Sequence, residues 1–133
     1  MRPILALTLA ALGLAGSAAA QDAAEGRLLF TAHCVACHGP QARGTGPMAE
    51  ILAIPTPDLT GLKARNGGEF PVWRVVSRID GRDPLLAHGG EMPIFGGFFE
   101  RDEEVSLKTA GGQPVMTSRP IADIVAFLES VQE

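Results

Sequence analysis

The chain has 133 residues, of which 46% are hydrophobic and 20% charged, with 16 glycines and 10 prolines. This composition indicates a folded domain and excludes a disordered segment, while the glycine and proline content disfavours a plain helical bundle. The formal net charge of −4 argues against nucleic acid as the main partner, because phosphates require a basic surface. Only two cysteines are present, so a disulfide framework is excluded.

Residues 1–20 differ in character from the rest of the chain. The basic Arg2 precedes a short apolar run, and small residues follow, with Ala18 and Ala20 placed as a signal peptidase requires. This pattern predicts a secretory signal over 1–20 and one domain over 21–133. An uncleaved membrane anchor is the alternative, which the alanine and glycine in the second half of the segment disfavour. We therefore expect a periplasmic protein with no membrane span after cleavage.

The first helix is expected to follow Asp22, which with Glu25 resembles a capping box. Gly26, Phe30 and Cys34 then recur at every fourth position. These residues share one face of the predicted helix.

The middle of the chain is expected to alternate between loop and helix. Residues 39–68 contain four prolines among several glycines, which predicts an irregular wrap. The apolar spacing over 70–79 predicts a second helix, with Pro71 allowed in its first turn and Gly81 at its end. A loop is expected from 82 to about 100.

The last part of the chain predicts a small hairpin and a helix. Residues 105–117 contain two short strand-like arms, the second limited to a sheet edge by its proline. The apolar stripe over 121–131 predicts a helix, with Pro120 in the first turn and Ser118 or Thr117 as its cap. The chain is therefore expected to be mainly α, with three or more helices, long loops and a possible hairpin.

The chemistry lies in the segment Cys34-Val35-Ala36-Cys37-His38. In a c-type haem site, two thiols add to the haem vinyl groups, and a two-residue spacer places both thiols on one edge of the porphyrin. The histidine that follows is then held beneath the iron as an axial ligand. The motif predicts covalent haem held by Cys34 and Cys37, with His38 on the iron.

Two other uses of the cysteines are weaker. A zinc site needs a second ligand pair, and the sequence offers only the scattered His33 and His88. A thioredoxin-like thiol pair follows a strand, whereas the residues before Cys34 indicate a helix.

With this motif in place, the chain resembles the class I monohaem c-type cytochromes of bacterial periplasm. The resemblance spans nearly the whole of residues 21–133 and rests on four features: Gly26-x-x-x-Phe30 before the haem motif, Gly44-Thr45-Gly46-Pro47 after it, Met92-Pro93-x-Phe95 in a late loop, and a final helix with Phe127.

The resemblance implies a cytochrome c domain with one covalent haem c. It implies that Gly26 and Phe30 meet the last helix near Phe127. It also implies that the Pro47 carbonyl accepts a hydrogen bond from the second ring nitrogen of His38. The segment over 96–120 is longer than the family's usual link between the methionine loop and the last helix.

Met92 is the expected second axial ligand, because a thioether stabilises Fe(II) and glycines flank its loop. Met48 is too close to His38 along the chain and is expected to fill the core. Met116 precedes the last helix too closely to reach the iron. His88 is the alternative ligand, in a bis-histidine site.

Trp73 on the second predicted helix is expected either to donate to a haem propionate or to lie in the core. Five basic residues lie from Lys63 to Arg82, and acidic residues predominate after 100. This asymmetry indicates either solvated faces or an electrostatic docking site.

The sequence therefore predicts a one-electron carrier and not an enzyme, with Fe(II)/Fe(III) cycling at a His38/Met92-ligated haem. Its expected partners are redox proteins such as a dehydrogenase, a reductase or a terminal oxidase. One alternative is the electron-accepting haem subunit of a periplasmic or membrane-bound oxidoreductase complex. Another is a ligand-binding haem protein with an open distal position.

Overall fold

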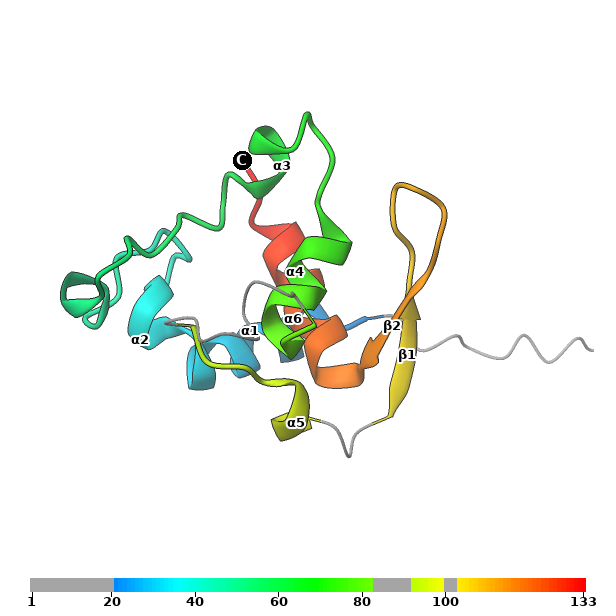
Figure 1. The fold of residues 1–133 in the computed structure, drawn as a ribbon, viewed down its shortest axis with the longest axis horizontal. Coiled ribbons are helices and arrows are strands. Elements are labelled where there is room, and N and C mark those ends of the chain that lie inside the picture. The colour runs from blue at the N-terminus through cyan, green and yellow to red at the C-terminus, as the bar shows by residue number, and fades with distance from the viewer. Residues whose placement is uncertain (1–20, 83–91, 100–102) are drawn as a thin grey trace, which may run out of the picture.

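The computed structural model describes residues 21–82, 92–99 and 103–133. The elements follow in the order α1 (Ala23–His33), α2 (Val35–His38), the 3-10 turn η1 (Ala49–Ile51), α3 (Leu62–Arg65), α4 (Val72–Asp80), α5 (Gly96–Phe99), β1 (Glu104–Leu107), β2 (Val115–Ser118) and α6 (Arg119–Ser130). The predicted mainly α fold with one hairpin is confirmed (Figure 1). In the described residues no helix is both long and apolar enough to span a bilayer.

The core forms where α1 crosses α6, and α4 packs against α6 beside this crossing (Figure 1). Gly26 lies so close to α6 that a Cβ there would overlap with the carbonyl oxygen of Asp123. The close approach brings the rings of Phe30 and Phe127 to a centroid separation of 5.1 Å, and both are buried. Each buried phenylalanine contributes about 1.5–3 kcal/mol. The implied meeting of Gly26 and Phe30 with the last helix is confirmed.

The start of α1 shows a cap that differs in part from the expected capping box. The Asp22 carboxylate accepts hydrogen bonds from the backbone N–H groups of Ala24 and Glu25, at 2.8 and 3.2 Å. The Asp22 N–H, which a capping box would bond to Glu25, instead donates to Oδ1 of Asp123 at 2.7 Å. The Asp123 side chain of α6 therefore completes the cap of α1 and links the two helices.

The middle of the chain is more helical than the sequence predicts. Short helical turns, η1 and α3, lie inside the expected irregular wrap, and α5 lies inside the expected loop. Gly81 ends helix α4 with φ = 86°, as predicted, whereas the helix begins at Val72, so that Pro71 is its N-cap residue and not part of its first turn. The N–H of Phe95 donates to the Ile79 carbonyl at 2.8 Å, so the end of α4 anchors the segment that forms α5.

The hairpin and the last helix agree with the prediction apart from one contact. Strands β1 and β2 pair antiparallel, with Ser106 opposite Met116. Pro120 lies in the first turn of α6 and Ser118 is its N-cap residue. The Ser118 hydroxyl makes no capping bond, and the N–H of Arg119 donates instead to the Glu103 carbonyl at 2.7 Å.

Candidate functional site

The two cysteines and His38 lie on one short helical turn that follows α1 directly. The helix is interrupted at Cys34, which ends α1 and begins α2. The N–H of His38 donates to the Cys34 carbonyl at 2.9 Å, which closes the turn. The structure therefore brings together the three residues that the motif predicts for haem attachment.

A glycine-containing loop wraps this turn through its backbone. The N–H of Gly44 donates to the His38 carbonyl at 2.8 Å, and the N–H of Gly46 donates to the Cys37 carbonyl at 3.0 Å. A Cβ on Gly46 would overlap with the carbonyl oxygens of Val35 and Ala36. These positions hold glycine because the loop must lie directly on the backbone of α2.

His38 is buried, with 8% of the residue's surface exposed. Burial lowers the pKa of His38 from its ordinary value, and the backbone of Pro57 beside the ring opposes this shift. Nδ1 is buried and makes no hydrogen bond of ordinary geometry. The hydrogen bond from this nitrogen to the Pro47 carbonyl, which the resemblance implies, is therefore not formed in the structure.

The thiol of Cys34 shows no sign of redox activation. Cys34 and Cys37 are half-buried and are not joined in a disulfide. Burial, together with the neighbouring Cys37, raises the pKa of Cys34 to about 11. A redox-active thiol has a lowered pKa, so the raised pKa of Cys34 is unlike that of an oxidoreductase thiol. Within the described ranges, no group of three or more His, Cys, Asp or Glu side chains is arranged to hold a metal ion.

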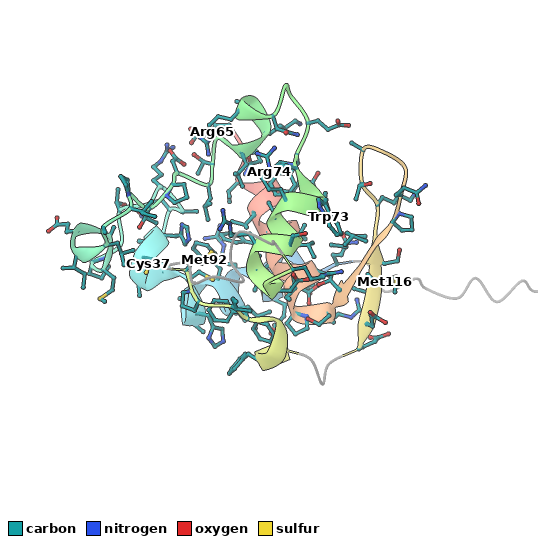
Figure 2. The ribbon with its side chains drawn as sticks, viewed as in Figure 1. Cys37, Arg65, Trp73, Arg74, Met92 and Met116 are labelled. Atoms are coloured by element: carbon teal, nitrogen blue, oxygen red, sulfur yellow. The ribbon has the colours of Figure 1, made fainter. Side chains whose placement is uncertain are left out.

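Met92 lies on the same side of the molecule as Cys37, whereas Met116 lies on the opposite side (Figure 2). Met92 and Cys34 are both half-buried and pack against the same hydrophobic core. Met116 is 43% exposed on β2, and Met48, expected in the core, is also 43% exposed. The position of Met92 suits an axial ligand, and that of Met116 does not. His88 lies outside the described residues.

An aromatic cluster next to Met92 was not foreseen. The ring of His33, at the end of α1, lies 5.9, 5.2 and 5.8 Å from the rings of Phe95, Phe98 and Phe99. The cluster joins the residue before Cys34 to the segment that follows Met92. Three phenylalanines follow Met92 closely in the sequence, and this pattern could have indicated the cluster.

Trp73 contributes neither to the core nor to the region of the haem motif. It is 55% exposed and lies away from Cys37 (Figure 2). The guanidinium of Arg82 lies over its ring, 5.7 Å from the centroid. The expectation of a core tryptophan was wrong, because Val75 and Val76 form the buried face of α4.

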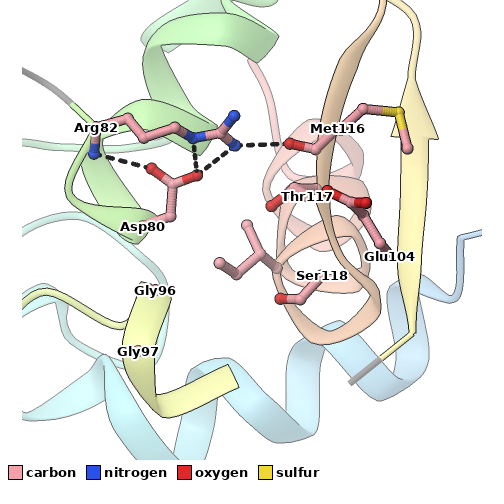
Figure 3. Close-up of a pocket in the computed structure, with 9 residues that line it drawn as sticks. Asp80, Arg82, Gly96, Gly97, Glu104, Met116, Thr117 and Ser118 are labelled. Carbon is pink, nitrogen blue, oxygen red and sulfur yellow. Dashed lines mark hydrogen bonds and ion pairs between the residues drawn. The ribbon is translucent and has the colours of Figure 1, made fainter. Parts of the chain in front are cut away.

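The structure also has an open pocket of about 540 Å³ between the end of α4, α5 and the hairpin (Figure 3). Arg82 pairs there with Asp80 and donates to the Met116 carbonyl at 2.7 Å. None of the predicted site residues lines this pocket. It is therefore separate from the haem motif.

A family model for cytochrome c matches residues 23–132. The chain belongs to the cytochrome c family. Membership means that the cytochrome binds haem c covalently and functions in electron transfer, and the match covers the motif, Met92 and the crossing of α1 and α6. No curated protein matches the chain.

The residues present fit this cofactor. The buried imidazole of His38, whose Nδ1 makes no hydrogen bond, suits a ligand that would bind iron through a ring nitrogen. The two half-buried thiols, which are not joined in a disulfide, suit addition to vinyl groups. Met92 supplies a thioether on the same side of the molecule (Figure 2).

Proposed function

We propose that this cytochrome is a class I, monohaem carrier of the bacterial periplasm that transfers one electron at a time between redox proteins. Cys34 and Cys37 hold the haem, and His38 and Met92 are its axial ligands. The observation that carries this proposal is the placement of Met92 on the side of the haem motif and of Met116 away from it.

When bound, the haem supplies the Fe(II)/Fe(III) couple. The residues that bind the iron determine its reduction potential and whether a coordination position stays open. With His38 and Met92 on the iron, no coordination position is open to a substrate, so the site carries electrons and does not activate ligands. The thioether of Met92 favours Fe(II) and gives the raised potential typical of a His/Met site.

The periplasmic location rests on the N-terminal sequence. The family match begins at residue 23, so residues 1–20 lie outside the domain, as a cleaved signal would. Haem attachment outside the cytoplasm agrees with this location. We propose that cleavage after Ala20 releases the domain over 21–133.

Covalent attachment is tested with protein made in cells that have a working haem-attachment system. The unmutated chain should keep its haem stain after denaturing electrophoresis, and the double variant Cys34→Ser/Cys37→Ser should lose it, because only thioether bonds survive unfolding. An unstained parent protein would contradict the proposal.

Two further observations separate the carrier from the alternatives. A carrier purifies alone, whereas the haem subunit of an oxidoreductase complex purifies with a larger chain. A His/Met site also resists carbon monoxide in the reduced state, whereas an open distal position binds it readily. Rapid carbon monoxide binding would contradict ligation by Met92.

A further inference from the structure

The two strands of the hairpin differ in how their outer edges are covered. On β2, the carbonyl of Met116 accepts from the guanidinium of Arg82 at 2.7 Å, on the side of the strand away from β1 (Figure 3). Ser106 lies opposite Met116 on β1. In an antiparallel pair, a residue whose backbone points away from the partner strand is opposite one whose backbone also points away. The N–H and the carbonyl of Ser106 therefore face outward from the hairpin.

A second bond gives the same alternation. The N–H of Arg119 donates to the Glu103 carbonyl at 2.7 Å, so Glu103 faces the β2 side. Because bonded and non-bonded positions alternate along an antiparallel ladder, Glu104 and Lys108 face outward together with Ser106. All three residues are exposed, and no hydrogen bond from the described residues reaches their backbone groups. The outer edge of β1 is therefore open to a further strand.

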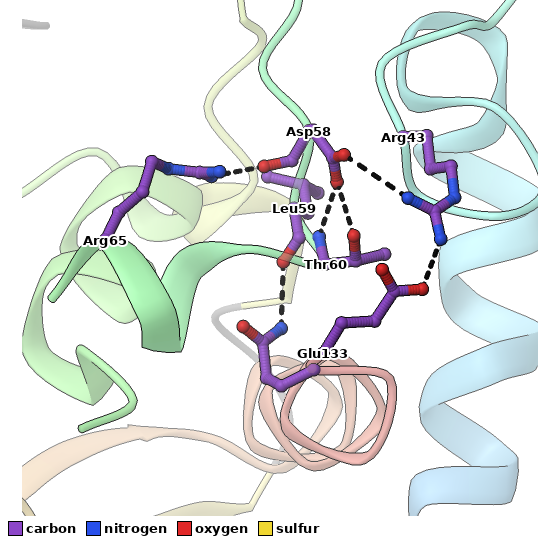
Figure 4. A network of polar contacts seen from close by, with 7 residues as sticks. Arg43, Asp58, Leu59, Thr60, Arg65 and Glu133 are labelled. Carbon is purple, nitrogen blue, oxygen red and sulfur yellow. Dashed lines mark hydrogen bonds and ion pairs between the residues drawn. The ribbon is translucent and has the colours of Figure 1, made fainter. Parts of the chain in front are cut away.

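This edge carries two charges without a partner. Elsewhere on the surface Glu133 pairs with Arg43 (Figure 4), whereas Glu104 and Lys108 form no ion pair with any described residue. The carboxylate and the ammonium lie at equal separations along the chain on the two sides of Ser106. Such an edge is complementary in charge to a second copy of itself that runs in the opposite direction.

We propose that the outer edge of β1 binds the same edge of a second copy of this chain, with a two-fold axis at Ser106. In this register, Glu104 of each copy lies opposite Lys108 of the other. Outward-facing residues then meet outward-facing residues, so the two strands can form hydrogen-bonded pairs. Opposite charges across the pair stabilise it, and the two hairpins form one four-stranded sheet.

The charges favour this register over its neighbours. An axis at Glu104 places two carboxylates together, and an axis at Lys108 places two ammonium groups together, and both arrangements are unfavourable. An axis at Val105 or Leu107 places Ser106, instead of a counter-charge, opposite one of the charged residues. Charges on an edge strand often prevent pairing, but an edge with one charge of each sign attracts its own copy in a single register.

Pairing through β1 leaves the haem motif accessible. Cys37 and Met92 lie on the side of the molecule opposite to Met116 and the hairpin (Figure 2). Both copies in the dimer can therefore meet redox proteins. The contact is confined to one short strand from each copy, so we expect a weak dimer with a Kd on the order of 0.1 mM.

Sedimentation equilibrium of the haem-loaded protein tests the association from about 10 µM to about 1 mM. The parent should pass from monomer to dimer across this range. Lys108→Glu and Glu104→Lys change the net charge in opposite directions, but each places like charges opposite one another in two pairs. Each should therefore raise the Kd about tenfold. Lys63→Glu, at an exposed position on α3, is the control and should keep the parent's Kd.

Exchanging the charges should restore the dimer. In the double variant Glu104→Lys/Lys108→Glu, each charge again lies opposite a counter-charge, so the Kd should return to the parent's value. An equimolar mixture of the two single variants should associate more strongly than either variant alone, because both charged pairs in the mixed dimer join opposite signs.

Amide hydrogen exchange identifies the strand edge in the same samples. The N–H groups of Glu104, Ser106 and Lys108 should exchange more slowly at high protein concentration, whereas those of Val105 and Leu107, which face β2, should change less. A parent that stays monomeric at about 1 mM overturns the proposal. So does a dimer whose Kd is the same in Lys108→Glu as in Lys63→Glu, or whose outward N–H groups exchange at a rate independent of concentration.

Discussion

The two sides of the proposed haem site are built in different ways. Around His38, the loop with Gly44 and Gly46 is bonded through its backbone to the carbonyls of α2. Around Met92, the described segment has one backbone bond to α4, from Phe95, and a close approach of Gly96 to the Asp80 carbonyl, and it also depends on aromatic side chains. The histidine side therefore depends mainly on backbone contacts, whereas the methionine side depends also on the packing of aromatic rings.

The largest effect is expected from adding a methyl group on the histidine side. Gly46→Ala places a Cβ against the carbonyls of Val35 and Ala36, so the loop must leave α2. We expect a loss of about 3 kcal/mol in the free energy of unfolding, with a lower yield of attached haem. Gly97→Ala on the methionine side meets no atom within 4 Å and should behave as the parent in denaturation and haem stain. Equal stability of the two variants would contradict the comparison.

Removing a side chain on the other side should change the ligand set. Met92→Ala should abolish the far-red sulfur-to-iron band of the oxidised protein, lower the potential, and make the iron high-spin or let water or His88 take the empty position. Met116→Ala removes an exposed side chain on β2 and should keep the band. The reverse pattern in the absorption spectra would show that the hairpin segment brings the ligand.

The aromatic cluster should contribute less than the ligand itself. His33→Ala removes the ring that contacts Phe95, Phe98 and Phe99. The free energy of unfolding should fall by about 1 kcal/mol, and the far-red band should disappear at a lower temperature on heating. Thr31→Ala, an exposed position on the same helix, is the control. If both variants lose the band at the parent's temperature, the cluster does not hold the methionine side.

The smallest effect is expected in acid. Hydrogen bonds from Thr60, and then the charges of Arg43 and Arg65, hold the pKa of Asp58 below its ordinary value of 3.8. The associated stability is complete above that value and is lost as pH falls through the lowered pKa. Asp58→Asn should therefore show a weaker decline of the unfolding midpoint below about pH 4 than the parent. Glu69→Gln is the control, and an identical decline in all three proteins would exclude this role of Asp58.

Local patterns predicted the parts of the molecule that depend on near neighbours. The cysteine spacing, the stripe of α6, the end of α4 at Gly81 and the crossing at Gly26 all follow from residues a few positions apart or from the family resemblance. The helical turns α3 and α5 were missed, since glycine and proline content outweighs weak periodicity over four residues.

Contacts between distant segments could not be predicted. Asp123 takes the place of Glu25 at the start of α1, and Nδ1 of His38 does not bond to the Pro47 carbonyl. Each depends on how separate parts of the chain pack, which periodicity does not encode. The core position expected as one alternative for Trp73 was wrong for the same reason, since its neighbours on α4 supply the buried face.

The most direct test of the account is the absorption spectrum of the purified, unmutated protein in both oxidation states, with the haem content per chain. We expect one haem per chain, a low-spin spectrum in both states, a far-red sulfur-to-iron band in the oxidised protein, and no response to carbon monoxide on reduction. A high-spin spectrum without the far-red band, changed readily by carbon monoxide, would contradict ligation by His38 and Met92.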